Sequence, residues 1–169
     1  MIRFFLLFLV LQVSLFTLEL LRPVQQAVVI PFTEGVAAVS VWLVKLFDAG
    51  VLAQGNVIRD LESGFAVAIE AGCNGVEATI VLLAAMLAFP APWHHRLLGI
   101  LAGFLAVQGI NLVRIISLFY LGQWDKDWFE WAHLYLWQAL IMLDVLVVFL
   151  IWIRLLPPAQ SPIQAPAHA

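Results

Sequence analysis

Long apolar runs, separated by short clusters of charged residues, proline and glycine, limit what this chain can fold into. The first run, residues 4–21, would form a helix of about 27 Å, close to the hydrocarbon thickness of a bilayer, about 30 Å. Hydrophobic residues make up 64% of the chain and charged residues 11%, against about 45–50% and about 25% in soluble domains. We therefore predict an integral membrane protein that is embedded in the lipid bilayer.

The apolar pattern predicts an all-α polytopic membrane fold in a single integral membrane domain, residues 1–155. Four transmembrane helices are predicted, at about residues 4–21, 74–89, 97–121 and 133–153. Residues 24–47 are also apolar, but Pro31, Glu34 and Lys45 interrupt them and leave too short a stretch to cross. We interpret this segment as an extracytoplasmic interfacial helix. A tilted fifth span is the alternative, and it would reverse the topology of every later segment.

Residues 56–71 change from helical to alternating periodicity. Phe65, Val67 and Ile69 alternate with smaller or charged residues, and a Ser63-Gly64 turn separates them from the run of residues 57–61. Two short runs around such a turn predict a β-hairpin. An open sheet edge cannot face lipid, so the hairpin is expected to lie outside the hydrocarbon. It would lead the chain directly to Cys73.

Basic residues are distributed unevenly over the four predicted spans. Arg3, Arg96 and Arg154 fall on one side, which carries no Asp or Glu, and nearly all acidic residues fall on the other. The positive-inside rule therefore places both termini in the cytoplasm and residues 22–72 in an extracytoplasmic insert. A five-span chain would scatter the basic residues over both sides. With a net charge of −3 and no Lys/Arg run, nothing indicates a nucleic-acid partner.

The two ends of the chain carry further expectations. Arg3 and the apolar residues 4–18 are typical of a signal peptide, but no small-x-small cleavage site follows, so we predict an uncleaved signal-anchor helix. Residues 156–169 are rich in Pro, Ala and Gln. This composition predicts a disordered cytoplasmic tail.

Cys73 is the only cysteine, which excludes an intramolecular disulfide and a CxxC metal site. It is either inert packing or a nucleophile. A position at the start of a helix would favour its thiolate form, because free backbone N–H groups and the helix dipole stabilise negative charge there. His94 and His95 suggest a metal or haem ligand pair, but adjacent residues face apart and no other ligand lies on that side. We predict no metal and no cofactor.

Arg114 lies inside the third predicted span, where burying a charge costs about 2.5–3.5 kcal/mol. It is either a structural arginine, snorkelling to the interface or paired with a buried acid, or a functional one. Asn111 lies three residues earlier on the same helix face, so Arg114 is expected to point into the bundle. Counted from the inner ends of their helices, Cys73 and Arg114 reach a similar depth, about 24 and 26 Å.

His133 begins the last span, up to one turn nearer the surface than Cys73 and Arg114. Interfacial histidines are common and often have no chemical role. With an unperturbed pKa of about 6.5, however, a histidine at the mouth of the bundle is a suitable base for a thiol. A nucleophile, an oxyanion donor and a base that converge on three neighbouring helices predict acyl transfer.

The motifs that hold these residues also resemble those of a known family. Cys73-Asn74-Gly75 after a hairpin, Asn111-Leu112-Val113-Arg114 in the next span, and His133 are similar to the Cys-[Ser/Asn]-Gly, Asn-x-x-Arg and His motifs of the exosortase/archaeosortase family. The resemblance covers about residues 51–153. The small size and Asn74 are similar to the short exosortase H branch, since larger members carry additional N-terminal spans.

The resemblance implies a cysteine transpeptidase of the Gram-negative bacterial inner membrane, with its active site on the periplasmic side. Its substrates would be membrane-anchored proteins with a C-terminal motif, a transmembrane helix and a basic end. By this resemblance Cys73 would attack the scissile carbonyl, His133 would shuttle the proton and Arg114 would hold the oxyanion. The thioester would then be resolved by an acceptor amine or by water.

Several residues are expected to support this site: Asn74, Gly75, Asn111, Glu77 and Asp144. Glu77 lies one turn below Cys73, although an acid in the first turn of a helix is also favoured by the dipole alone. Asp144 lies eleven residues after His133, on the same face and in the middle of the membrane. A protonated Asp144 that is hydrogen-bonded between helices is an equally simple interpretation.

Two other functions use the same sequence features. A non-enzymatic helper subunit of a membrane complex would pack Gly99 and Gly103, a small-xxx-small pair, against a partner. An intramembrane hydrolase that uses water alone would need the same three catalytic residues.

Three tryptophans near the last span predict an interfacial aromatic belt, with substrate docking as the alternative: Trp124, Trp128 and Trp131.

Overall fold

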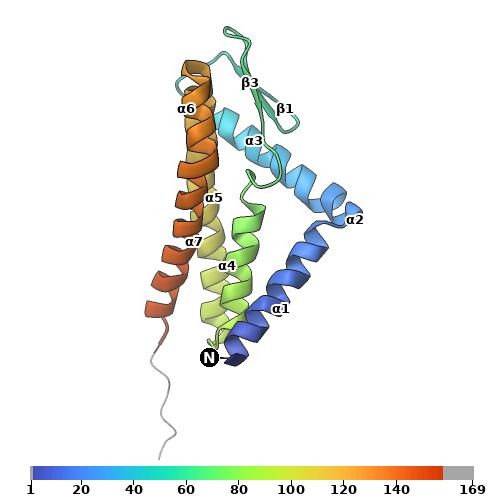
Figure 1. The fold of residues 1–169 in the computed structure, drawn as a ribbon, viewed down its shortest axis with the longest axis vertical. Helices are drawn as coiled ribbons and strands as arrows, with labels where there is room; N and C mark the ends of the chain where they lie inside the picture. Colours follow the sequence, from blue (N-terminus) through green and yellow to red (C-terminus); the bar gives the residue numbers. More distant parts are fainter. Residues whose placement is uncertain (1, 158–169) are drawn as a thin grey trace, which may run out of the picture.

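The computed structural model describes residues 2–157, and it forms a helical bundle with a small sheet at one end (Figure 1). Its helices are α1 (Ile2–Glu19), α2 (Arg22–Val24), the π-helix η1 (Gln25–Val29), α3 (Ile30–Val44), α4 (Val76–Ala88), α5 (Trp93–Trp124), α6 (Lys126–Trp131), the π-helix η2 (Ala132–Leu136) and α7 (Trp137–Arg154). The predicted fold class, mostly helical with four helices that could span a membrane and a short antiparallel sheet, is confirmed. Most of the predicted tail, residues 158–169, lies outside the described residues.

Four helices are long and apolar enough to cross a membrane, but they are not the four that we predicted. They are Ile2–Glu19, Arg22–Val44, Trp93–Trp124 and Lys126–Arg154. The helix that follows Cys73, Val76–Ala88, is shorter than a full span, because Pro90 and Pro92 follow its end. The expectation that residues 24–47 contain no stretch long enough to cross was wrong, because the helix over residues 22–44 has that length.

Helix continuity through Pro31 has a local cause. Pro31 lies in the first turn of α3, where a missing N–H is tolerated. The turn before it is the π-helix η1, whose wider hydrogen-bond spacing joins α2 to α3 without a gap. The combined helix leaves the end of α1 obliquely and passes under the sheet (Figure 1). Residues 22–44 therefore have the length of a span and the tilt of the interfacial helix that we predicted.

The sheet has one strand more than the predicted hairpin. β1 (Val51–Gln54), β2 (Val57–Asp60) and β3 (Ala66–Ala68) pair antiparallel in the order β1-β2-β3. Ile58 lies opposite Val67 across the predicted hairpin, and Val51 lies opposite Asp60. Asp60 closes the β2–β3 turn, because its carboxylate accepts the N–H groups of Glu62 and Ser63.

The segment between the third and fourth predicted spans, residues 122–132, is largely helical and not the short loop that the span bounds predict. α5 continues to Trp124, and α6 begins one residue later. Asp125 makes this restart possible, because its side chain accepts the N–H groups of Asp127 and Trp128 and caps the new helix. The charged residues of this segment are thus the cap and the exposed surface of α6.

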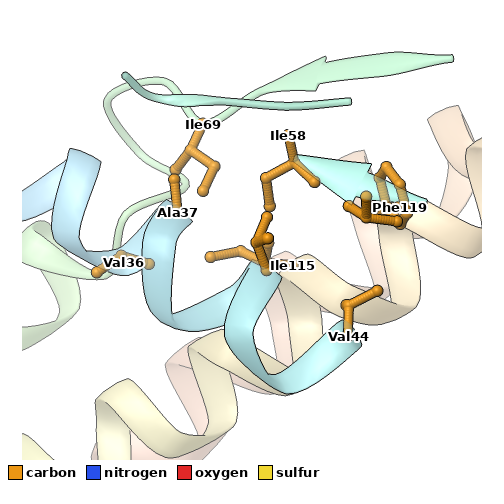
Figure 2. Close-up of a cluster of buried hydrophobic side chains, with 9 residues drawn as sticks. Val36, Ala37, Val44, Ile58, Ile69, Ile115 and Phe119 are labelled. Atoms are coloured by element: carbon orange, nitrogen blue, oxygen red, sulfur yellow. The ribbon is translucent and has the colours of Figure 1, made fainter. Parts of the chain in front are cut away.

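Two separate cores hold the chain together. The outer core lies between α3, the sheet and α5 (Figure 2) and consists of Val36, Ala37, Val41, Val44, Val51, Ile58, Ile69, Ile115 and Phe119. The inner core lies between α4, α5 and α7 and consists of Ala78, Leu82, Met86, Val107, Ile141, Val145 and Trp152. The outer core covers the strand that precedes Cys73, so it fixes the approach of the chain to that residue.

Gly99 and Gly103 are buried inside the chain rather than facing outward. A Cβ at Gly99 would overlap the indole of Trp152, and a Cβ at Gly103 would lie 2.6 Å from Leu82. The Trp152 indole N–H donates to the His95 carbonyl at 3.0 Å. The small-xxx-small pair therefore packs α5 against α4 and α7 of the same chain. These glycines give no support to a helper subunit that would use them to bind a partner.

Candidate active site

Cys73 lies in the turn that joins β3 to α4. Gly72 and Gly75 flank the turn with φ angles of 82° and 79°, a left-handed conformation that suits only glycine well. The Cys73 N–H donates to the Glu70 carbonyl at 2.9 Å. The two glycines and this bond reverse the chain sharply and turn the Cys73 side chain toward α5 and η2.

Arg114 reaches this turn from the middle of α5. One guanidinium nitrogen, Nη2, lies 3.6 Å from Cys73 Sγ, and the other, Nη1, donates to the Gly72 carbonyl at 3.2 Å. The side chain is only 3% exposed. A buried guanidinium therefore contacts both the thiol and the backbone beside it, and the snorkelling alternative does not describe its position.

His133 contacts the thiol from a third part of the chain, the π-helix η2. Its Nε2 lies 3.1 Å from Cys73 Sγ, a hydrogen-bonding distance for sulfur. The π-helix η2 (Ala132–Leu136) carries His133, and the Phe129 ring stacks on the imidazole with 5.7 Å between centroids. Phe129 precedes His133 by four residues, so a helix places the two rings on one face. Phe129 was missed from the sequence, although that spacing indicates the contact.

The three side chains open on a small cavity of about 100 Å³. Its walls come from the strand and loop before Cys73, from α5, and from the region of α6 and η2: Val67, Ala68, Ile69, Glu70, Cys73, Arg114, Ile115, Leu118, Phe129 and His133. The cavity is therefore mostly apolar except where the thiol, the guanidinium, the imidazole and the Glu70 carboxylate border it.

The protonation of the thiol differs from the expectation. Burial raises the pKa of Cys73, the Arg114 guanidinium opposes this effect, and the carboxylates of Glu77 and Glu70 add to it. Cys73 lies two residues before Gly75, the cap of α4, so it is outside the helix whose N-terminus was expected to stabilise a thiolate. The fold thus favours the neutral thiol over the thiolate, so a base beside the thiol would promote its reaction.

Asn74 and Glu77 hold the turn in place. Asn74 is 1% exposed, donates to the Thr33 hydroxyl on α3, and accepts the Val76 N–H at the start of α4. The Glu77 carboxylate accepts the Gly72 N–H. Gly72 is therefore held at both backbone atoms, by Glu77 at its N–H and by Arg114 at its carbonyl. Glu77 makes a specific contact to the turn, which a residue that only complements the helix dipole would not need.

Three other predicted residues have different surroundings. Gly75 is buried at the cap of α4, and Asn111 is 0% exposed against it, without a hydrogen-bond partner among the described residues. Asp144 is half-buried in α7, does not border the cavity, and its Oδ2 has no partner in the described part of the chain. The structure thus brings Gly75 and Asn111 to the turn and leaves Asp144 apart from it.

The two adjacent histidines and the three tryptophans that the sequence singled out lie outside the site. His94 is exposed and His95 is half-buried at the opposite end of α5. Within residues 2–157, no group of three or more His, Cys, Asp and Glu side chains is arranged to hold a metal ion. The three tryptophans of the predicted belt are exposed, at 77%, 54% and 48%: Trp124, Trp128 and Trp131.

Residues 1–159 match a family model, and that model describes the transmembrane exosortase. The chain belongs to the transmembrane exosortase family. Comparisons with curated proteins and with solved structures found no match. Membership of this exosortase family and the four apolar helices together establish a membrane protein.

Proposed function

We propose that this exosortase is a membrane-embedded cysteine transpeptidase. It would cleave a C-terminal sorting signal from secreted proteins and transfer the new C-terminus to an acceptor through a thioester. One observation carries the proposal: a half-buried thiol lies 3.1 Å from an imidazole and 3.6 Å from a guanidinium, beside a cavity. These three groups correspond to the nucleophile, base and oxyanion donor that acyl transfer needs.

The proposed reaction begins with proton transfer from Cys73 to His133. Sγ then bonds to the scissile carbonyl carbon, and Arg114 stabilises the negative charge that develops on the oxygen. When the tetrahedral intermediate collapses, the C–N bond breaks and His133 returns the proton to the leaving amine. The product that remains is a thioester between Cys73 and the substrate's new C-terminus.

An acceptor amine would complete the reaction by attacking the thioester carbon. The C–S bond breaks, the amine gives up its proton through His133, and Cys73 leaves as a thiol. Water in place of the amine would give simple hydrolysis with the same residues. The second step therefore distinguishes a transpeptidase from a hydrolase, and the first step is common to both.

The proposed substrates carry a short C-terminal motif, a transmembrane helix and a basic end. With both termini of the enzyme in the cytoplasm and the active site in the periplasm of a bacterial inner membrane, the motif would reach Cys73 from outside. The inner ends of the helices carry Arg3, Arg96 and Arg154 and no carboxylate in the described residues. The substrate's basic end would therefore contact lipid phosphates, because the protein there is itself positive.

The proposal is tested with a membrane-anchored reporter that carries such a signal, co-expressed with variants of the enzyme. Cys73→Ala is expected to abolish processing. Arg114→Ala is expected to lower the rate about 10²–10³-fold, as loss of an oxyanion donor does, and His133→Ala about 10²–10⁴-fold. Processing is followed by the mass of the reporter.

Matched controls separate chemistry from folding. His94→Ala and Arg59→Ala remove an exposed histidine and an exposed arginine away from the site, and both are expected to process the reporter normally. All variants are compared for membrane insertion and amount. Full processing by Cys73→Ala would refute the proposal. Trapping the thioester with and without an added amine then shows whether an amine changes the product.

A further inference from the structure

α5 carries a row of buried polar side chains that extends beyond the three catalytic candidates. Gln108, Asn111 and Arg114 follow one another at intervals of three residues, with exposed fractions of 9%, 0% and 3%. Within residues 2–157, Gln108 Oε1 and both amide atoms of Asn111 have no hydrogen-bond partner. Unpaired buried amide atoms destabilise a fold, so apolar side chains of similar size would pack α5 at a lower cost.

Gln108 connects α5 to the first turn of α4. Its Nε2 donates to the Gly75 carbonyl and to the Thr79 hydroxyl, both at 3.3 Å. The same carbonyl already accepts the Thr79 N–H at 3.1 Å and the Thr79 hydroxyl at 2.8 Å. Because α4 satisfies this carbonyl by itself, the bonds from Gln108 are not needed to form the helix. They fix the start of α4 against α5.

Gly75 allows this contact to be close. A Cβ at residue 75 would lie 2.8 Å from Gln108 Nε2 and 3.1 Å from Asn111 Nδ2, so both amides rest on the glycine backbone. Gly75 lies two residues after Cys73, and Gln108 lies within two turns of Arg114. The contact thus joins the segment that carries the thiol to the segment that carries the guanidinium.

We propose that Gln108 is a positioning residue, which acts through Gly75 and Thr79 to hold Cys73 in register with Arg114. The inference rests on the proposed function, because an aligned thiol and guanidinium matter most for acyl transfer. Gln108 does not border the cavity at Cys73. It therefore acts on the position of the nucleophile and leaves the binding of substrate unchanged.

The first test measures alkylation of Cys73 by iodoacetamide as a function of pH in the purified full-length protein. Four charged or titratable groups face the thiol: Arg114 from α5, His133 from η2, Glu70 from the preceding loop and Glu77 from α4. Arg114 is the group that stabilises the thiolate. Gln108→Met keeps the size of the side chain and removes both bonds, so the alkylation profile is expected to move to higher pH, with about threefold slower alkylation at pH 8.

A matched control and a second variant complete this test. Gln123→Met changes another glutamine of α5, which contacts Ser63 at the sheet and not α4, and it is expected to keep the wild-type profile. Thr79→Val removes one of the two acceptors of Gln108 with little change of shape, and a smaller shift in the same direction is expected. It decides the question if Gln108→Met does not fold.

The second test uses the reporter substrate and measures thioester formation. Gln108→Met is expected to lower kcat about 10- to 100-fold, the effect of a misplaced nucleophile, with KM unchanged. Wild-type alkylation profiles in both Gln108→Met and Thr79→Val would overturn the inference. If the wild-type enzyme forms no thioester, the proposed function fails, while the alkylation profiles still decide whether Gln108 positions Cys73.

Discussion

Two opposing effects act on the pKa of the Cys73 thiol. Burial raises the pKa of the thiol, and the Arg114 guanidinium lowers it, with burial the larger effect. The neutral thiol is consequently the form that the fold favours. Its contribution to stability is present below the pKa of the unfolded chain and is lost as the pH rises through the higher pKa of the folded protein. His133 lies where it can accept the proton as the reaction begins.

This balance predicts slow alkylation of Cys73 in the folded protein. At pH 7 to 8, Cys73 is expected to react with iodoacetamide more slowly than a free cysteine, and the rate is expected to keep rising above the pH at which free cysteine levels off. Arg114→Met removes the one stabilising charge and is expected to shift the profile further upward. A profile centred below that of free cysteine would contradict burial as the dominant influence on the thiol.

Residue-level chemistry was partly predictable. The convergence of Cys73, Arg114 and His133 follows from counting residues along helices of known rise, because depth in a bilayer is nearly proportional to sequence distance. The protonation of the thiol was not predictable, since it depends on burial by β3 and α5, which is a tertiary property. Gln108 precedes Asn111 by three residues, so the same spacing that placed Asn111 beside Arg114 indicates that Gln108 also faces α4.

Among the elements, α5 is the one that the others pack against in both cores. It contributes Ile115 and Phe119 to the outer core and Val107 to the inner one. Its contact with α7 depends on Gly99, where the Trp152 indole lies against the helix backbone and donates to the His95 carbonyl. Without a hydrophobic force between helices in lipid, such close packing and hydrogen bonds hold the helices together.

A pair of glycine variants on α5 tests this packing. Gly99→Ala is expected to displace the indole, to break its bond to His95 and to lower stability by about 1–3 kcal/mol, seen as a lower Tm in detergent. Gly109→Ala is the control, because no atom lies within 4 Å of its added methyl group. Alanine in the helix interior is expected to raise stability there by about 0.5–1 kcal/mol. Equal effects of the two variants would exclude Trp152 packing as the cause.

The elements themselves were predicted unevenly. The β2–β3 hairpin has strict alternation and a Ser-Gly turn, so its sequence pattern is clear. β1 was missed, although Gly55 with a φ of 58° follows it and Gly-Asn is a hairpin turn signal. Residues 24–47 were judged too interrupted to cross the membrane, because the π-helix that leads the chain into Pro31 leaves no sign in the hydropathy pattern. The helix is continuous through Pro31 because of its backbone geometry, which a hydropathy pattern does not report.

On the scale of the whole molecule, the outer core and the inner core divide the chain into two environments. Large side chains on the helix surfaces are exposed, among them Val10, Leu101 and Leu143, as lipid contact requires. The outer core covers one face of a sheet whose edges remain open, and such a sheet is stable only outside the hydrocarbon. Although residues 22–44 have the length of a span, the oblique course of α3 under this sheet favours an interfacial position for them, and so the four predicted crossings over five (Figure 1).

The number of membrane crossings is tested by finding the side of the membrane on which three positions of the chain lie. In a Cys73→Ser background, single cysteines at Arg3, Ser63 and Arg154 are labelled with a membrane-impermeant maleimide in intact spheroplasts. Four crossings predict that only the cysteine at residue 63 is labelled before lysis, and that all three are labelled after it. Labelling of residue 154 in intact cells would indicate a fifth crossing by residues 22–44.

The order of the three site residues along the chain has a consequence for synthesis. Cys73 is synthesised first, Arg114 follows on α5, and His133 comes only with the last helical segment. In the proposed transpeptidase, a nascent chain that lacks its last span therefore carries the nucleophile without the base that would remove its proton. Acyl transfer by the proposed transpeptidase would thus begin only when the last span is in place, and proteins near the unfinished chain would be spared.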